Sequence, residues 1–262
     1  MKQILPFSMR SGECRKATLK GGSTVLQIYA VAISHFPNTQ LLPLLSCVSR
    51  EKSEKLSRFH HQEDLIRGLI GDLLVRKMIS ETLAVPVKRI VFGTNSYGKP
   101  YLAIPDNSSF HYNVSHSGDW VVCAIDDCPV GIDIEKIQPV QLEISRRFFA
   151  REEVEFIEKA PSDEQRQERF FAVWTAKESY IKAIGQGLSH SLNNFSTVRE
   201  GNVEGWRVFD HWNWYLKAYN LDDRYALAVC GQKSQVCETV RVISPDDIIR
   251  YVLGDPRQQN VH

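Results

Sequence analysis

Two carboxylates in the stretch VGIDIE stand at the spacing that places both on one face of a β-strand. Asp133 and Glu135 alternate with the apolar Ile132 and Ile134, so an extended chain points both acids to the same side. Two like charges this close repel each other unless a cation lies between them. A hard cation such as Mg²⁺ is often held by one or two carboxylates together with substrate phosphate. The pattern therefore indicates either a cation site or a solvated acidic face on an edge strand.

A third acid and a lysine come from the stretch WTAKESYIKAIGQG (174–187), which belongs to a predicted helix. The apolar stripe of this helix consists of Phe170, Val173, Trp174, Tyr180, Ile181 and Ile184. Lys177 falls near the centre of the stripe, and Glu178 and Lys182 fall on its shoulder. In one interpretation Glu178 and Lys182 form an i,i+4 pair worth ~0.2–0.5 kcal/mol, and Lys177 reaches past the core into water. In the other, Glu178 completes the cation site and Lys182 contacts a phosphate bound there.

Groups that suit a phosphate occur in three other stretches. In HYNVSHSGDW, Ser115 and His116 end a strand at a Gly-Asp hairpin and present a hydroxyl, an imidazole and turn amides. The alternative for His116 is a purely structural hydrogen-bond donor. Lys99 in YGKP and Lys52 and Lys55 in EKSEK lie in loops or caps, where the alternative is an ordinary solvated lysine.

The composition places these groups in a globular chain that has no strong overall field. The 262 residues are 43% hydrophobic and 10% aromatic, which suffices for a large core in one domain or two lobes. Thirty-two basic and 31 acidic residues give a net charge of +1, so no global field attracts nucleic acid or an anionic membrane. Six cysteines without CxxC spacing, the absence of a secretory signal and the lack of ~18 consecutive apolar residues predict a cytoplasmic protein with reduced thiols.

The elements that must position these side chains are segregated into groups of strands and groups of helices. Strand patterns lie at 25–33, 89–92, 110–115, 120–126, 130–135, 195–198, 206–210, 212–220 and 225–230. Helical patterns lie at 62–83, at 148–157, from a capping box at Ser162 to Gly185 or Gly187, and at 243–253. Such segregation predicts an α+β fold.

No Pro/Ser-rich linker divides the chain, and its weakest seam lies around Pro129. We therefore expect an N-terminal lobe over 25–128 and a C-terminal lobe with the cation site over 129–245. Residues 246–262 are expected to form a C-terminal helix and a frayed end, and residues 1–24 a peripheral tail.

The order of these motifs resembles a known family, the surfactin-type (Sfp-type) 4′-phosphopantetheinyl transferases. The motifs are EKSEKLSRFHHQEDLIRGLIGDLLVRKMIS, YGKPYL, FHYNVSHSGDW, PVGIDIEKI, FFAREE and FFAVWTAKESYIKAIGQGLS. The resemblance runs from about Val25 to the 240s, and G-I-D-I-E followed by W-x-x-K-E-x-x-x-K is highly specific. It implies two similar α+β lobes in a pseudo-twofold arrangement, a coenzyme A site in the cleft between them, and a monomer.

The resemblance also implies an activity and a set of site residues. The activity is Mg²⁺-dependent transfer of 4′-phosphopantetheine from coenzyme A to a serine of an apo carrier protein or domain (peptidyl, acyl or aryl), with release of adenosine 3′,5′-bisphosphate. The implied Mg²⁺ ligands are Asp133, Glu135 and Glu178. The implied coenzyme A-binding residues are Lys52, Lys55, Arg67, Lys99, Ser115, His116 and Lys182. Glu178, acting directly or through a metal-bound water, is the first choice for the base that takes the serine proton. Glu153 is the second choice, and Lys182 would stabilise the leaving phosphate.

Some features depart from the family pattern or leave alternatives open. Where the family has a threonine after the arginine of the long helix, this chain has Gly68 after Arg67, so one nucleotide hydrogen bond would be missing or replaced. The stretch 137–149 is expected either to contact the carrier or to belong to the core. Its apolar residues are Leu142, Ile144, Phe148 and Phe149.

Two other function classes remain alternatives to the transferase. One is a non-catalytic module that binds coenzyme A or a carrier protein with the same fold, and the other is a metal-dependent enzyme acting on another nucleotide. A degenerate module would be expected to lose acid or lysine positions, whereas this chain keeps all three carboxylates and the lysine, namely Asp133, Glu135, Glu178 and Lys182. The transferase is therefore the favoured hypothesis.

Overall fold

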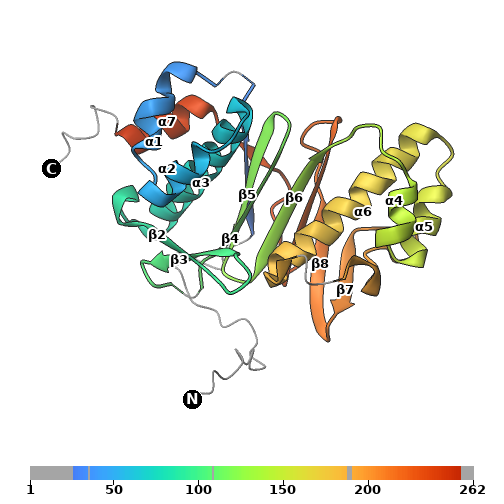
Figure 1. Cartoon of the computed structure of the whole chain (residues 1–262). Helices are drawn as coiled ribbons and strands as arrows, with labels where there is room; N and C mark the ends of the chain where they lie inside the picture. Colours follow the sequence, from blue (N-terminus) through green and yellow to red (C-terminus); the bar gives the residue numbers. More distant parts are fainter. Residues whose placement is uncertain (1–25, 35, 108, 188–190, 255–262) are drawn as a thin grey trace, which may run out of the picture.

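The computed structural model describes residues 26–34, 36–107, 109–187 and 191–254, and Figure 1 shows them as two α+β lobes. The strands of the N-terminal lobe are β1 (Gln27–Ala32), β2 (Val91–Thr94), β3 (Pro100–Ile104), β4 (His111–Ser117) and β5 (Trp120–Asp126). Its helices are α1 (Leu41–Leu45), α2 (Arg50–Leu56) and α3 (Gln62–Leu83), with 3₁₀ turns η1 (Asn38–Gln40) and η2 (Val87–Arg89). The predicted tail at 1–24 lies outside the described residues.

The C-terminal lobe begins with the strand that carries Asp133. Its strands are β6 (Val130–Lys136), β7 (Gly205–Phe209), β8 (Trp212–Ala218) and β9 (Tyr225–Gly231). Its helices are α4 (Glu143–Phe148), α5 (Arg151–Glu158) and α6 (Asp163–Ile184), with a 3₁₀ turn η4 (Leu192–Asn194). The chain then forms β10 (Arg241–Val242) and α7 (Pro245–Leu253).

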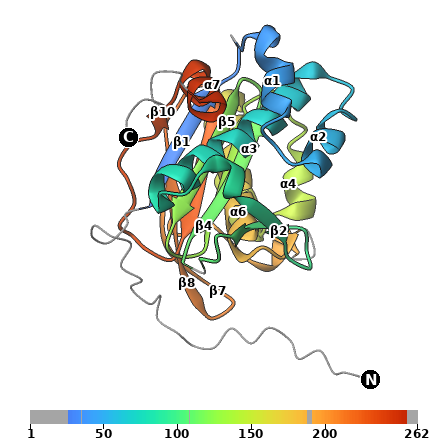
Figure 2. The same cartoon turned by 90° about the vertical axis from the view of Figure 1, so that its left-hand side faces the viewer.

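The two lobes stack as four layers: a helix, two sheets face to face, and a second helix (Figure 1). The first sheet has the order β10-β1-β5-β4 and the second β6-β9-β8-β7, while β2 and β3 form a separate hairpin. Alternation along β5 explains the layering, because Cys123 belongs to the core under α3 whereas Val122 belongs to the core between the sheets. Figure 2 shows α3 lying across the outer face of the N-terminal sheet.

The second long helix repeats this arrangement in the C-terminal lobe. Both α3 and α6 have 22 residues, and each packs on a four-stranded sheet, so the predicted α+β fold of two similar lobes is confirmed. Helix α6 lies directly on β6 at Gly131, where a Cβ atom would come 1.9 Å from the Ser179 carbonyl oxygen. This close approach brings the α6 turn with Glu178 and Lys182 next to Asp133.

The last described segment returns to the N-terminal lobe. Strand β10 pairs in parallel with β1, and Ile248 and Ile249 of α7 are buried in the core around α3. The structure thus places residues 241–253 with the N-terminal lobe, whereas we expected the C-terminal lobe to extend to residue 245. Sequence order gave no signal for this return, because β10 has only two residues.

Side chains rather than backbone groups join β4 to β6 at the edge where the two sheets meet. Asn113, Ser115 and Ser117, which alternate along β4, accept hydrogen bonds from every second backbone N–H of β6. The donors are Ile132, Ile134 and Lys136, at N···O distances of 2.9, 3.4 and 3.1 Å. We call this set the junction ladder.

The helix limits largely follow the sequence signals. The Ser162 side chain accepts a hydrogen bond from the Gln165 N–H at 3.2 Å, and α6 ends at Gly185 with φ 69°, as predicted. The predicted helix at 148–157 is instead two helices, because Ala150 is extended and Phe149 is buried with 4% of its surface exposed.

Two other predictions of local structure are corrected. Residues 195–198 form no strand, because the N–H and hydroxyl of Thr197 donate to Glu153 Oε1 at 2.7 and 2.9 Å rather than to a neighbouring strand. The charged segment at 49–61 contains α2, whose N-cap Ser49 accepts from the Lys52 N–H at 3.2 Å. Helix α2 has only one buried residue, so it gives little hydrophobic periodicity.

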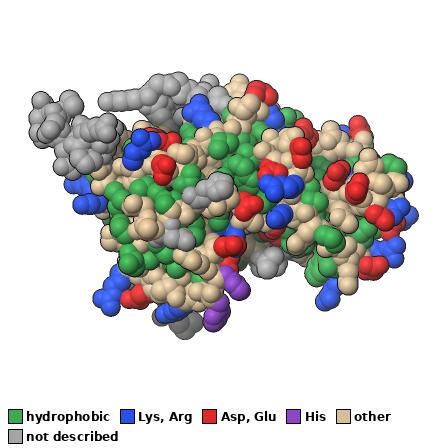
Figure 3. Space-filling view, turned by 90° about the horizontal axis from the view of Figure 1, so that it is seen from above, with side chains coloured by type: hydrophobic (Ala, Val, Ile, Leu, Met, Phe, Trp, Pro, Cys, Tyr) green, Lys and Arg blue, Asp and Glu red, His purple; other side chains and the backbone are tan. Residues whose placement is uncertain are grey.

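The surface agrees with the balanced composition. Basic and acidic side chains are interspersed over the face shown in Figure 3. Within the described ranges no helix is long and apolar enough to cross a bilayer. The described free cysteines are Cys47, Cys123, Cys230 and Cys237. Cys128 is disulfide-bonded, so the prediction of reduced thiols is wrong for it; spacing along the chain does not tell which cysteines meet in space.

The prediction that Lys177 reaches past the core into water is wrong. Its ammonium group lies 2.7 Å from Glu153 Oε2, and both side chains are completely buried. Lys177 Nζ also donates to the carbonyl oxygens of Leu192 and Phe195 at 2.7 and 2.6 Å. The three N–H donors of the Lys177 ammonium group thus have three acceptors, which offsets the cost of burying its charge.

Lys177→Met is expected to lower the free energy of unfolding by about 3–5 kcal/mol, because it strands the buried Glu153 carboxylate without its cation. Urea denaturation measures the loss. Lys159→Met on the exposed end of α5, where 75% of the lysine side chain is accessible, is the matched control and should change stability by less than about 1 kcal/mol. Equal effects of the two substitutions would contradict the assignment.

Candidate functional site

The centre of the candidate site is a buried aspartate bound by one group from each lobe. Lys182 Nζ of α6 lies 2.5 Å from Asp133 Oδ1, and the Ser115 hydroxyl of β4 donates to the same oxygen at 2.8 Å. Lys182 Nζ also donates to Ser115 Oγ at 3.0 Å. The structure thus brings together three predicted site residues that are far apart in sequence.

The charge of this aspartate acts on the two other predicted acids. Burial raises the pKa of Glu178, and Asp133 and Glu135 raise it further while Lys182 opposes them. Burial and the Asp133 charge also raise the pKa of Glu135, although the Ser117 hydroxyl donates to Glu135 Oε2 at 2.9 Å. Three acids therefore lie close enough to disfavour one another's ionisation.

The donor set fits a hard cation, although no three His, Cys, Asp or Glu side chains within the described residues are already arranged around one point as metal ligands. Asp133 Oδ2 is buried and has no hydrogen-bond partner there, which leaves an oxygen ligand unsatisfied. Burial raises the pKa of Asp133, and Lys182 and Ser115 counteract this. A cation would relieve both the unpaired oxygen and the repulsion among the acids.

A cleft of about 570 Å³ adjoins this cluster on the N-terminal side. Helices α2 and α3, the β2–β3 hairpin and β4 form its walls. Four predicted coenzyme A-binding residues line it, namely Lys52, Lys55, Arg67 and His116. Gly68 and Asp72 of α3 also line it.

Strand β4 separates the cleft from the acid cluster and serves both. Tyr112, Val114 and His116 line the cleft, whereas the alternate residues of β4 form the junction ladder. The enclosing walls, the Arg67 guanidinium and the Lys182 ammonium all lower the pKa of His116, which favours a neutral imidazole near neutral pH. His116 is therefore placed between the basic groups of both lobes.

The cleft cations are held in different ways. Arg67 donates to the Gly118 carbonyl at 2.7 Å and to Asp64 at 2.6 Å, so it ties α3 to the β4–β5 turn. Burial lowers the pKa of Lys52, the neighbouring Lys55 adds to this, and Asp72 opposes it. An added anion between the lysines would reduce their repulsion.

Lys99 does not line the cleft, in contrast to its predicted role. Its ammonium group donates to the carbonyl oxygens of Ala183 and Val130 at 3.0 and 3.3 Å, and Asn95 Nδ2 donates to the Gly185 carbonyl at 2.9 Å. The β2–β3 hairpin thereby binds the C-terminal end of α6, whose partial negative charge favours a cation. Burial lowers the pKa of Lys99 to about 8.

Glu153, the second choice for the base, is a structural residue here. Its side chain is completely buried and paired with Lys177, and it accepts the Ala150 N–H at 2.8 Å and the two Thr197 groups. These bonds fill its acceptor positions and leave none for a substrate hydroxyl. We therefore retain only Glu178 as the proposed base.

Two polar residues at this site, Asn113 and Ser117, were not among the predicted site residues. Both belong to the junction ladder, and Ser117 also contacts Glu135. The signal was present in the N-x-S-x-S alternation of NVSHS, because it places three polar side chains on one face of a predicted strand, where they require partners if the face is buried.

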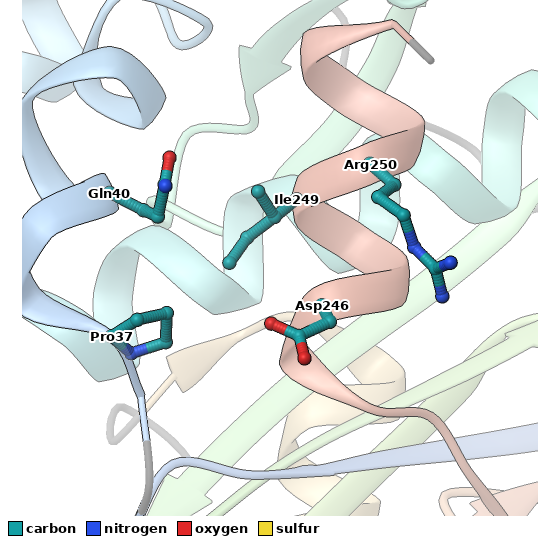
Figure 4. A pocket seen from close by; sticks show the side chains of 5 residues that line it. All are labelled: Pro37, Gln40, Asp246, Ile249 and Arg250. Carbon is teal, nitrogen blue, oxygen red and sulfur yellow. The ribbon is translucent and has the colours of Figure 1, made fainter. Parts of the chain in front are cut away.

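Two other hollows formed by described residues contain none of the predicted site residues. One of about 420 Å³ lies between the segment before α1 and helix α7 (Figure 4) and is lined by Pro37, Gln40, Asp246, Ile249 and Arg250. Another, of about 550 Å³, lies between α3, β10 and α7. Asp247 accepts a bond from Arg250 at 2.5 Å there, and Lys77 pairs with Glu81.

Comparison with known proteins identifies the class of this chain. The family model described as "4'-phosphopantetheinyl transferase, N-terminal" matches residues 37–127, and "4'-phosphopantetheinyl transferase superfamily" matches residues 129–230. Both lobes are thus accounted for, and the chain belongs to the 4′-phosphopantetheinyl transferase family.

Individual relatives agree with this assignment. The 4′-phosphopantetheinyl transferase Sfp of Bacillus subtilis (strain 168) is 42% identical over 78% of this chain and 91% of its own length. The 4′-phosphopantetheinyl transferase psf-1 of Bacillus pumilus is 39% identical over 80% of this chain and 90% of its own. The L-aminoadipate-semialdehyde dehydrogenase-phosphopantetheinyl transferase of Homo sapiens is 28% identical over 76% and 72%.

The raised pKa values of the acids predict a pH dependence of stability. A carboxyl with a raised folded-state pKa holds protons that the unfolded state has lost, so the folded state loses stability as pH rises through that window. Glu178→Gln removes one charge of the cluster. Without divalent cations, the variant should gain stability relative to the parent protein between about pH 4 and pH 7.

Urea denaturation across this pH range tests the prediction. Glu168→Gln, at an exposed position of the same helix, is the matched control and should follow the parent at every pH. A Glu178→Gln curve that runs parallel to the parent curve would show that the acids do not repel one another.

Proposed function

We propose that this protein transfers the 4′-phosphopantetheine group of coenzyme A to a serine of an apo carrier protein and releases adenosine 3′,5′-bisphosphate. One observation supports this most strongly: the Asp133, Ser115 and Lys182 cluster, which both lobes build, adjoins a cleft lined by Lys52, Lys55 and Arg67. Coenzyme A carries a pyrophosphate and a separate 3′-phosphate, so it requires cationic groups at two places. Belonging to the 4′-phosphopantetheinyl transferase family supports the same reaction.

The arrangement of α6 and β6 supports distinct roles for the two helix residues. The carrier serine oxygen forms a bond to the β-phosphorus, and the bond from this phosphorus to the bridging oxygen breaks. Glu178, whose pKa is raised by burial, takes the serine proton. Lys182 moves from Asp133 toward the bridging oxygen and stabilises the charge that develops on the leaving adenosine 3′,5′-bisphosphate.

Asp133, Glu135 and Glu178 are the residues that would hold Mg²⁺ in this reaction. When bound, the ion withdraws charge from the pyrophosphate oxygens. Ser115 orients Asp133 through its hydrogen bond at 2.8 Å, and Ser117 does the same for Glu135. His116, Arg67, Lys52 and Lys55 would bind the nucleotide end in the cleft.

We further propose α4 as part of the carrier-binding surface. Ile144 and Phe148 are 37% and 38% exposed, and the Arg147 guanidinium lies 5.2 Å from the centre of the Phe148 ring. Phe149, by contrast, packs on Phe170 at 5.2 Å between ring centres and belongs to the core. A carrier with an apolar patch beside acidic groups, whether peptidyl, acyl or aryl, fits this surface. We also propose that the protein acts as a monomer in the cytoplasm.

Asp133→Asn is expected to abolish transfer at saturating Mg²⁺ while the protein stays folded, because it removes one charge and nearly keeps the shape. The assay incubates the enzyme with coenzyme A, Mg²⁺ and an apo carrier protein and measures the mass of the carrier, which should increase by one phosphopantetheine group. The variant should also lose most of the rise in melting temperature that Mg²⁺ with coenzyme A gives the parent.

Asp223→Asn in the exposed β8–β9 turn is the control and should behave like the parent in both measurements. If no carrier of several classes gains mass with the parent enzyme, the proposed reaction is wrong. If Asp133→Asn transfers in proportion to its folded fraction, Asp133 is only a structural partner of Lys182.

Lys182→Met is expected to lower kcat by more than about 100-fold and to change the KM for coenzyme A by only a few-fold. The reason is that a cation directed at the leaving oxygen acts mainly in the transition state. Steady-state kinetics with varied coenzyme A separate the two constants. A change confined to KM would make Lys182 a residue for ground-state binding.

A further inference from the structure

Helix α2 carries two cleft lysines but is attached to the protein by a single buried side chain. The helix has seven residues, of which only Leu56 is buried, with 1% of its surface exposed. Lys52 and Lys55 of the same helix line the cleft. The position of both ammonium groups therefore depends on how Leu56 is seated.

Leu56 is seated on Gly68 of α3. A Cβ atom added at Gly68 would come 2.6 Å from Leu56 Cδ2, which is far inside van der Waals contact. Gly68 lies in the interior of α3, where glycine is less favourable than alanine, and its φ is not in the left-handed region. Backbone conformation therefore does not require glycine here, but the observed position of the Leu56 side chain leaves no room for a Cβ atom at residue 68.

We infer that Leu56 and Gly68 are positioning residues for coenzyme A: their contact sets the depth of α2 and so directs Lys52 and Lys55 to the 3′-phosphate. This inference rests on the proposed function. The pyrophosphate belongs at the lobe junction, beside Lys182 and the acids. The separate phosphate of the same ligand is then the group left for the lysines on the opposite wall of the cleft.

Charge at this wall is consistent with a bound anion. Burial lowers the pKa of Lys52, the nearby Lys55 ammonium lowers it further, and Asp72 of α3 opposes both. A 3′-phosphate would accept charge-assisted hydrogen bonds from two lysines only if α2 lies at the proper depth. A shift of about 1 Å in α2 would lengthen both bonds beyond hydrogen-bonding distance.

The test compares coenzyme A with 3′-dephospho-coenzyme A in the presence of Mg²⁺, using calorimetric titration of the full-length protein. Gly68→Ala should raise the Kd for coenzyme A about tenfold, the size expected for weakened bonds to a charged group. It should change the Kd for the dephospho ligand by less than about twofold, because that ligand lacks the affected phosphate. An equal loss for both ligands would show a merely structural role and overturn the inference.

Two further variants make the assignment specific. In the double variant, Leu56→Val removes one carbon and Gly68→Ala adds one at the same contact, so packing is restored. The Kd of the double variant for coenzyme A should therefore return to within about twofold of the parent value. In a Lys52→Ala, Lys55→Ala background, Gly68→Ala should have no additional effect, because the lysines through which it acts are gone. A full additional loss in that background would overturn the inference.

The melting temperature of each variant separates loss of affinity from loss of fold. If Gly68→Ala does not fold, the double variant Leu56→Val, Gly68→Ala is used for the test instead. It is expected to fold and to prefer coenzyme A over the dephospho ligand as strongly as the parent does. A folded double variant without this preference would contradict the inference. A parent enzyme that neither binds coenzyme A nor modifies a carrier would refute the proposed function. A parent that does both, together with a Gly68→Ala variant that binds coenzyme A equally well, would refute only this inference.

Discussion

The arrangement of the site depends on the junction ladder between β4 and β6. Two edge strands that meet inside a protein must satisfy their backbone N–H groups, and here Asn113, Ser115 and Ser117 accept those bonds in place of a backbone ladder. Ser115 also donates to Asp133, so the bonds that join the lobes also orient the buried acid. The lobe contact and the geometry of the acid cluster therefore cannot vary independently.

Two lysines on α6, five residues apart, have the same charge but different burial and different partners. Lys177 is completely buried, and its three donors are used by Glu153 and two carbonyl oxygens. Among the described residues, Lys182 bonds to Asp133 and Ser115, and 28% of its side chain is exposed. The first is fixed by its environment, whereas the second keeps an ammonium group that is partly open to solvent.

Much of this could be predicted from the sequence because strong local signals coincide with the elements that matter. The 62–83 helix, the Ser162 cap and Gly185 all follow hydrophobic periodicity and capping rules. The apolar stripe of α6 correctly indicated that Lys177 lies on the packed face of the helix. It could not show that Glu153 of α5 lies opposite Lys177. That pairing joins helices α5 and α6 in space, and the contact of Lys99 joins the β2–β3 hairpin to the end of α6. Helix α2 was missed for a related reason, since a single buried leucine produces no periodicity.

The location of positive charge follows from the same long-range contacts. A net charge of +1 offers a polyanion no general attraction, so any phosphate site must be assembled locally. Lys52 and Lys55 come from the N-terminal lobe and Lys182 from the C-terminal lobe, on the two sides of β4. The alternation of this one strand presents His116 to the cleft and Ser115 to the acids. The cationic surroundings of the cleft and cluster are therefore a product of lobe docking, and a lobe by itself would hold only one part of them.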